Sequence, residues 1–160
     1  MNQRPACCCS RPQAIAHIHG SASYPDIRGT VEFFQTPSGV LVQTLLKGLP
    51  HADAPCAGHV FGFHIHEGHC CSGNVADPFS NAMGHYNPGG CKHPQHAGDL
   101  PPLFETCGSA FSVVLTGRFR VSEIIGKTVI VHSSPDDFTT QPSGNSGEKI
   151  ACGVVCANCM

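Results

Sequence analysis

The sequence predicts an all-β protein in which antiparallel strands form a sandwich or barrel and two long loops carry polar residues. Short segments rich in β-branched and apolar residues alternate with turns such as SYPD and TPSG. Only VSEIIG resembles a helical turn, and no strong amphipathic helix is apparent. Residues 68–102 and 133–147, rich in Gly, Pro, Asn, Asp and His, carry almost no strand signal. Loops of such length are normally functional or disordered.

We expect one domain, residues 14–160, after a flexible tail at residues 1–13 that contains Cys7, Cys8 and Cys9. The expected strands lie in order at 14–20, 27–35, 39–49, around 63–66, 108–121, 127–133 and 149–155.

Composition excludes several classes of function. The formal net charge is −2, and no cluster of Lys and Arg indicates a nucleic-acid or membrane-surface partner. No apolar run reaches the roughly 18 to 20 residues of a membrane span. The N-terminal segment lacks the apolar core of a secretory signal, so a cytoplasmic protein is expected.

Cysteine and histidine are unusually frequent, with 11 of each. Both are normally sparse and both bind transition metals, so a metal site is the first expectation. A secreted disulfide scaffold is the less favoured reading, because such scaffolds are typically shorter and carry an export signal.

The segment FGFHIHEGHCC places two histidines one residue apart on an expected strand. Because successive side chains point to opposite faces, His64 and His66 share one face, and Phe63 and Ile65 share the other. Two imidazoles on one face can bind one ion, although a strand with a merely polar histidine face explains the pair equally well.

The two long loops add further ligand types. The first contains His85, His93, His96 and Asp99, a set that matches a tetrahedral zinc site. An expected strand delivers His132 to the second loop.

Asp136 and Asp137 follow His132 closely. A metal-bound histidine usually donates its other N–H to a carboxylate or carbonyl, and these aspartates are candidates for that role. A turn after Pro135 explains Asp137 equally well.

These motifs resemble those of the copper/zinc superoxide dismutase family, in the same order. The matching segments are GFHIHEG, GHYNP, KHPQHAGDLP, GKTVIVHSSPDD and GNSGEKIACGV, and the likeness covers roughly residues 14–155. The resemblance implies a Greek-key, immunoglobulin-like β-sandwich or barrel. It also implies conversion of superoxide to dioxygen and hydrogen peroxide at a copper ion, beside a structural zinc ion.

The resemblance implies roles residue by residue. The implied copper ligands are His64, His66, His85 and His132, and the implied zinc ligands are His85, His93, His96 and Asp99. His85 would therefore bridge the metals and carry a proton during catalysis. Asp136 would link the two sites through hydrogen bonds, while Gly62 and Glu67 would lie in a tight strand turn.

Some features depart from the family pattern. Lys149 stands where an arginine is usual, which keeps the charge but loses the planar fork that holds a small anion. We expect Lys149 to guide superoxide more weakly. The loop between His93 and His96 is shorter than expected, and the loop from His132 to Lys149 is trimmed, which bears on metal affinity and electrostatic steering.

The family disulfide joins the first loop to the cysteine that matches Cys152. Cys71 is the favoured partner, with Cys70 as the alternative. Cys56 and Cys107 are expected to be buried free thiols.

Histidines and cysteines outside these motifs could capture metal. Cys7–Cys9, His17, His19, Cys156 and Cys159 are the residues concerned. Solvated histidines on a strand face and a frayed terminus with thiols are the simpler interpretation.

The sequence therefore predicts a superoxide dismutase with copper and zinc as cofactors and superoxide as substrate. The alternative is a non-catalytic copper/zinc-binding module, such as a metal buffer or a chaperone-like domain that kept the fold. Extra cysteines, the missing arginine and the trimmed loops favour this alternative, and the complete ligand set argues against it. The sequence shows no recognisable interface and leaves open whether the chain forms a homodimer.

Overall fold

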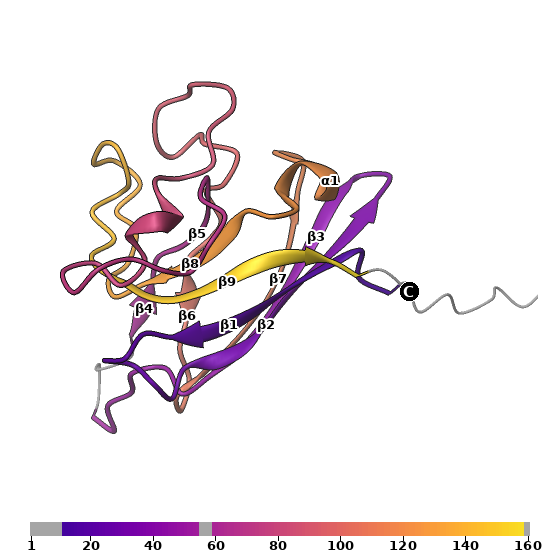
Figure 1. Cartoon of the computed structure of the whole chain (residues 1–160). Helices are drawn as coiled ribbons and strands as arrows, with labels where there is room; N and C mark the ends of the chain where they lie inside the picture. The colour runs from indigo at the N-terminus through magenta and orange to yellow at the C-terminus, as the bar shows by residue number, and fades with distance from the viewer. Residues whose placement is uncertain (1–10, 55–58, 159–160) are drawn as a thin grey trace, which may run out of the picture.

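A computed structural model describes residues 11–54 and 59–158, and nearly all of its regular structure is β-sheet (Figure 1). Seven antiparallel strands form one curled sheet, in the order β5-β8-β9-β1-β2-β3-β7, that makes half a barrel. A second sheet pairs β4 with β6. The predicted all-β class is confirmed. The predictions for Cys7–Cys9, Cys56 and Cys159 fall outside the described residues.

The strands lie close to their predicted positions. They are β1 (Ala14–Gly20), β2 (Arg28–Thr36), β3 (Gly39–Lys47), β4 (Val60–Phe61), β5 (Phe63–His66), β6 (Leu103–Phe104), β7 (Ser109–Thr116), β8 (Thr128–His132) and β9 (Lys149–Ala157). Within residues 11–54 and 59–158, two helical turns complete the regular structure, the 3₁₀ turn η1 (Ser80–Ala82) and the α-helical turn α1 (Val121–Ile124). No expected strand or helical turn corresponds to β4, β6 or η1, which each comprise only two or three residues. Among the described residues, no helix is long and apolar enough to cross a membrane.

The short β4–β6 pair connects the two edges of the curled sheet. Strand β4 directly precedes the edge strand β5, and β6 shortly precedes the other edge strand, β7. Gly62 separates β4 from β5, and its N–H donates to the Ser134 carbonyl at 2.8 Å. A Cβ at Gly62 would lie 2.8 Å from the Ser146 side chain, so only glycine permits the second loop to pack this closely.

Alternation along β5 divides the apolar core from the polar outer face. Phe63 and Ile65 belong to the main apolar cluster inside the curl of the sheet. His64 and His66 are also buried, at 0% and 2% exposure, but they lie on the opposite face. The two long loops cover that outer face beside β5, β8 and β9 (Figure 1). The predicted division of this strand into two faces is confirmed.

A small second cluster fixes the first loop to the outer face of the sheet. It contains Phe79, Ala82, Ile130 and Cys152, with Cys71 packed against it. Cys71 and Cys152 form a disulfide whose Cα atoms are 5.7 Å apart. The pairing is the one favoured on the family resemblance, and Cys70 is an exposed free thiol. The cross-link joins positions 81 residues apart in sequence, so it restricts a large loop in the unfolded chain.

The expectation of a buried thiol at Cys107 was wrong, because Cys107 is exposed. It lies in the turn between β6 and β7, next to Gly108, and both residues have positive φ, 49° and 73°. Thr106 and Ser109 form the bridge that closes this turn. Such tight turns direct their central side chains toward solvent.

The histidines of β1 are exposed, as the simpler interpretation held. His17 and His19 alternate with the buried Ala16 and Ile18. Neither belongs to either group of metal-ligand residues found among the described residues.

Replacing Ile65 by alanine should lower the free energy of unfolding by about 2 to 5 kcal/mol, because the side chain is fully buried. Leu45→Ala is the control, since Leu45 is 44% exposed and its loss should cost about 0.5 kcal/mol or less. Urea unfolding of the metal-free variants measures both values. Equal losses would contradict the assignment of Ile65 to the core.

Candidate metal centre

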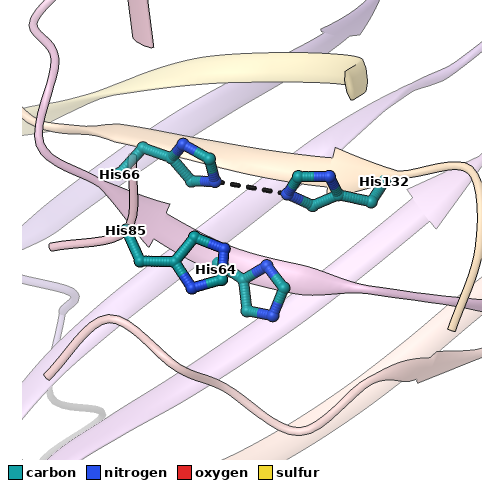
Figure 2. A group of neighbouring side chains, drawn as sticks. All are labelled: His64, His66, His85 and His132. Atoms are coloured by element: carbon teal, nitrogen blue, oxygen red, sulfur yellow. Dashed lines mark hydrogen bonds between the residues drawn. The ribbon is translucent and has the colours of Figure 1, made fainter. Parts of the chain in front are cut away.

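Two groups of metal-ligand residues lie side by side on the outer face of the sheet. The first, called the histidine group, consists of His64, His66, His85 and His132 (Figure 2). The second, called the mixed group, consists of His85, His93, His96 and Asp99. Within each group, one candidate ligand atom per residue lies within 4.8 Å of all the others. His85 is the one residue shared by both.

The sheet supplies three members of the histidine group. His64 and His66 project from β5, and His132 ends the neighbouring strand β8. His85 comes from the first loop, which pairs with the free edge of β5 through an isolated bridge between His66 and His85. The Tyr86 N–H donates to the Ile65 carbonyl at 2.8 Å and continues this pairing. Local backbone pairing thus places the loop histidine beside the strand histidines.

Hydrogen bonds orient the rings of the histidine group. The Nδ1–H of His66 donates to the Met83 carbonyl at 2.8 Å, and the Nδ1–H of His132 donates to the Gly147 carbonyl at 3.3 Å. The Nε2 atoms of the two rings therefore face each other, 3.2 Å apart (Figure 2). A hydrogen bond at one ring nitrogen determines which nitrogen is left free to bind a metal.

The mixed group is centred on the Asp99 carboxylate. Its Oδ1 lies 2.7 Å from His85 Nδ1 and 3.3 Å from His96 Nδ1. The Nδ1 atoms of His85 and His96 are 3.4 Å apart. His93 Nδ1 lies 3.1 Å from Asp99 Oδ2 but makes no hydrogen bond to it. Three imidazole nitrogens and one carboxylate oxygen therefore converge on one point.

The unpaired nitrogens of both groups fit bound cations. His64 Nδ1, His85 Nε2 and His93 Nδ1 are buried without a hydrogen-bond partner among the described residues. A buried polar atom without a partner costs about 1 to 3 kcal/mol and is rare in folded proteins. All three belong to residues of the two groups, so a metal ion in each group would satisfy them.

The donor sets differ in chemistry. Four imidazoles suit copper, and three imidazoles with one carboxylate suit tetrahedral zinc.

Burial keeps the strand histidines neutral. Desolvation lowers the pKa of His132 to about 3, and the nearby His64 adds to this effect. Desolvation also lowers the pKa of His66 well below its usual value, and that of His64 less strongly because Asp136 opposes it. A neutral imidazole is the form that binds metal. The folded chain therefore presents these three rings ready to coordinate.

The Asp136 carboxylate connects the two groups. Its Oδ2 accepts the Nε2–H of His64 at 2.7 Å, and its Oδ1 accepts the Nε2–H of His93 at 2.8 Å. Burial alone would raise the pKa of Asp136, but the hydrogen bonds from His64, the Phe138 N–H and His93 hold it far below its usual range. The carboxylate fixes the tautomers of one ring in each group.

Asp137 has a different role, and the turn interpretation holds for it. Its carboxylate accepts hydrogen bonds from the N–H groups of Thr139 and Thr140 at 2.9 and 2.8 Å. It makes no hydrogen bond to a histidine among the described residues.

Three residues that were not predicted from the sequence support the mixed group. Arg118 donates to the carbonyls of Pro94, His96 and Asp99. Gln141 binds the His93 backbone in both directions, accepting its N–H at 3.0 Å and donating to its carbonyl at 2.8 Å.

Gly144, the third of these residues, has φ +69°, and a Cβ there would lie 2.1 Å from Asp136 Oδ1. Only glycine therefore lets the second loop pass beside the Asp136–His93 hydrogen bond. Arg118, Gln141 and Gly144 follow no ligand spacing, so no local signal in the sequence marks them.

An open cavity of about 1380 Å³ gives access to the histidine group. His66, His85, His132 and Lys149 are among the residues that line it. The Lys149 ammonium does not project freely into this space, because its Nζ lies 2.5 Å from Asp77 Oδ2. Burial would raise the pKa of Asp77, but the hydrogen bonds from Lys149 and from the Phe79 N–H lower it. The family resemblance placed Lys149 near the site, but nothing in the sequence indicated its partner Asp77.

The chain is similar in sequence to a known family model and to several known proteins. Residues 27–155 match the family model described as copper/zinc superoxide dismutase. Superoxide dismutase [Cu-Zn] 2 of Aquifex aeolicus is 35% identical, over 88% of this chain and 85% of the relative. Superoxide dismutase [Cu-Zn] of Legionella pneumophila is 33% identical over the same shares. The copper chaperone for superoxide dismutase of Rattus norvegicus is 28% identical, over 89% of this chain and 52% of the chaperone.

Asp136→Asn should weaken zinc binding by about 10- to 100-fold, because one amide oxygen cannot accept both histidine N–H groups as the carboxylate does. Competition with a chromophoric chelator measures the affinity. Asp137→Asn makes the same chemical change at a carboxylate whose hydrogen bonds, in the part of the chain that the structure describes, all lie within its own turn, and the zinc affinity of this variant should stay unchanged. Equal effects of the two substitutions would contradict the linking role of Asp136.

The metal-free protein should lose stability as the pH falls from 6.5 to 5. His66 and His132 have folded-state pKa values below the unfolded value of 6.5, so the unfolded chain takes up protons first in this range. Their contribution is fully present above pH 6.5 and disappears as the pH falls toward the folded-state values. Urea unfolding at several pH values measures the slope.

The slope should be smaller in His132→Gln, which removes one of these groups. His17→Gln is the control, because His17 is exposed and lies outside both groups. A stability that is constant from pH 6.5 to 5 would contradict this account.

Proposed function

The chain belongs to the copper/zinc superoxide dismutase family, and from this premise we propose that it dismutes superoxide with copper in the histidine group and zinc in the mixed group. As a member of this family it is an oxidoreductase that acts on superoxide. Two superoxide anions and two protons give one dioxygen and one hydrogen peroxide, so one anion is oxidised and the other is reduced.

The position of His85 is the observation that carries the proposal. His85 belongs to both groups. Its Nδ1 lies 2.7 Å from Asp99 in the mixed group, and its Nε2 is buried without a hydrogen-bond partner among the described residues. This arrangement supports an imidazole that bridges two metal ions. A site for two unrelated metals would not need a shared ring.

The chain's own residues would divide the work of the reaction. When bound, copper supplies the one-electron redox change and zinc supplies a fixed positive charge. His64, His66 and His132 would hold the redox metal, each oriented through its second nitrogen. His85 Nε2 is the atom at which the chain would hold a proton and release it to the substrate. The proton would then be delivered beside the cavity where the anion binds.

Lys149 would attract the substrate anion into the cavity. It is a cavity-lining residue, and its backbone pairs with that of His132 across β8 and β9. An ammonium at this position raises the local concentration of a small anion. Lysine is flexible and strongly hydrated, so it orients the anion less strictly than a guanidinium would.

A non-catalytic metal-binding module is the second candidate function. Two observations favour it, the similarity to a rat protein named as a copper chaperone and the ion pair that engages Lys149. Such a module would bind both metals without turning over superoxide. The two candidates differ in activity at full metal occupancy, so they are distinguished on one sample.

The first experiment measures metal content and superoxide dismutation together on protein reconstituted with copper and zinc. We expect about one copper and one zinc per chain with fast dismutation. Full occupancy without dismutation would contradict the proposed enzyme and support the binding module.

Two variants test the assignment of the groups. His132→Ala should abolish dismutation and copper binding while zinc stays bound, because His132 belongs to the histidine group alone. His96→Ala should lose zinc instead, because His96 belongs to the mixed group alone. Dismutation that persists in His132→Ala would contradict the assignment of that residue.

A further inference from the structure

We propose that Asp77 restrains the access of small anions, superoxide included, by holding the Lys149 ammonium in an ion pair inside the cavity. This inference rests on the proposed function, to which it adds a residue that sets substrate access. Asp77 belongs to none of the motifs that predicted the site, and it would act through Lys149 rather than on the reacting atoms.

The contact joins a largely buried ammonium to a more exposed carboxylate. Lys149 Nζ lies 2.5 Å from Asp77 Oδ2, with side-chain exposures of 16% and 37% respectively. Both residues line the cavity that also exposes His66, His85 and His132. A hydrogen bond between an ammonium and a carboxylate is stronger than one between neutral groups, and an incoming anion must compete with Asp77 for the ammonium.

The structure fixes Asp77 in place. Its Oδ1 accepts the Phe79 N–H at 3.0 Å, and its carbonyl accepts the N–H groups of Asn74 and Ser80 at 3.0 and 3.1 Å. Phe79 is buried in the cluster that contains Cys152. The carboxylate therefore stays beside Lys149 when an anion approaches, because the loop around it is anchored to the sheet.

The other charges in the cavity give Lys149 no support. Lys149 is the only lysine or arginine among the described residues that line the cavity, and Asp77 and Glu148 are the acidic ones. The two carboxylates together outweigh the single ammonium. Asp77 and Glu148 therefore oppose the attraction that Lys149 exerts on an anion approaching the histidine group. Removal of one carboxylate should make the attraction stronger.

Asp77→Asn removes the charge with little change in shape. The amide oxygen can still accept the Phe79 N–H, so the loop keeps its local hydrogen bond. Asp77→Glu restores a carboxylate and should return the protein toward wild-type behaviour. Asp53→Asn is the matched control for net charge, because Asp53 is exposed and does not line the cavity.

The experiment compares these variants at equal copper and zinc content. In Asp77→Asn, kcat/KM for superoxide at low ionic strength should rise about three-fold, the factor that one unit charge at roughly 6 Å produces in water. The gain should fade at about 1 M salt, where screening acts over about 3 Å. Azide affinity, measured by the absorption of the copper-loaded protein, should rise by a similar factor. Asp53→Asn should leave both quantities unchanged.

The outcomes separate this inference from the proposed function. Unchanged or lower azide affinity and kcat/KM in Asp77→Asn would overturn the inference even if the wild-type protein dismutes superoxide. A gain that persists at high salt would also overturn it, since an electrostatic effect is screened. If the loaded wild-type protein fails to dismute superoxide while azide still binds more tightly to Asp77→Asn, the proposed function fails and the control of anion access stands.

Discussion

The hydrogen bonds of the Asp136 carboxylate are the constraint on which the arrangement of the site depends. Asp136 is 5% exposed, and its two oxygens accept N–H groups from His64 and His93. A buried carboxylate without such partners would be strongly destabilising. Each bond assigns the proton to Nε2 and leaves Nδ1 of the same ring for a metal. One residue of the second loop thus sets the tautomers of a strand histidine and a first-loop histidine together.

The loops that carry the ligands have little regular structure, so they depend on cross-connections to the sheet. The Cys71–Cys152 disulfide and the Asp77–Lys149 ion pair join the first loop to β9, three residues apart on that strand. Gln141 holds the segment of His93 against the second loop. The sheet therefore acts as a rigid support, and a few contacts between residues distant in sequence hold the loops against it.

The sequence predicted the parts of the site that depend on local pattern. Alternation in β5 placed His64 and His66 on one face, and the spacing within the first loop grouped His93, His96 and Asp99. Contacts between residues distant in sequence could not be predicted in this way. Lys149 and Asp77 are separated by 72 residues, and neither neighbourhood carries a signal that specifies the other. The contact between Lys149 and Asp77 depends on the path that the first loop takes in the folded protein.

Gly144 and Cys107 likewise differ from what their local sequence indicates. Gly144 resembles any loop glycine until the fold brings Asp136 within 2.1 Å of its would-be Cβ. Cys107 was expected to be buried because free cysteines usually are. Its place in a turn with two successive positive φ values overrode that tendency. The backbone conformation of the turn thus outweighed the tendency of the Cys107 side chain to be buried.

Burial of the histidines couples metal binding to the fold. Desolvation holds His66 and His132 in the neutral state, so the folded chain has already released the protons that metal binding would otherwise displace. Burial also leaves His64 Nδ1, His85 Nε2 and His93 Nδ1 without hydrogen-bond partners among the described residues, which weakens the metal-free fold. A metal ion in each group would bind these unpartnered nitrogens, and the histidines would stay neutral. The fold would therefore be more stable with metal than without it, because the buried nitrogens that weaken the metal-free chain are the ones that would bind the ions.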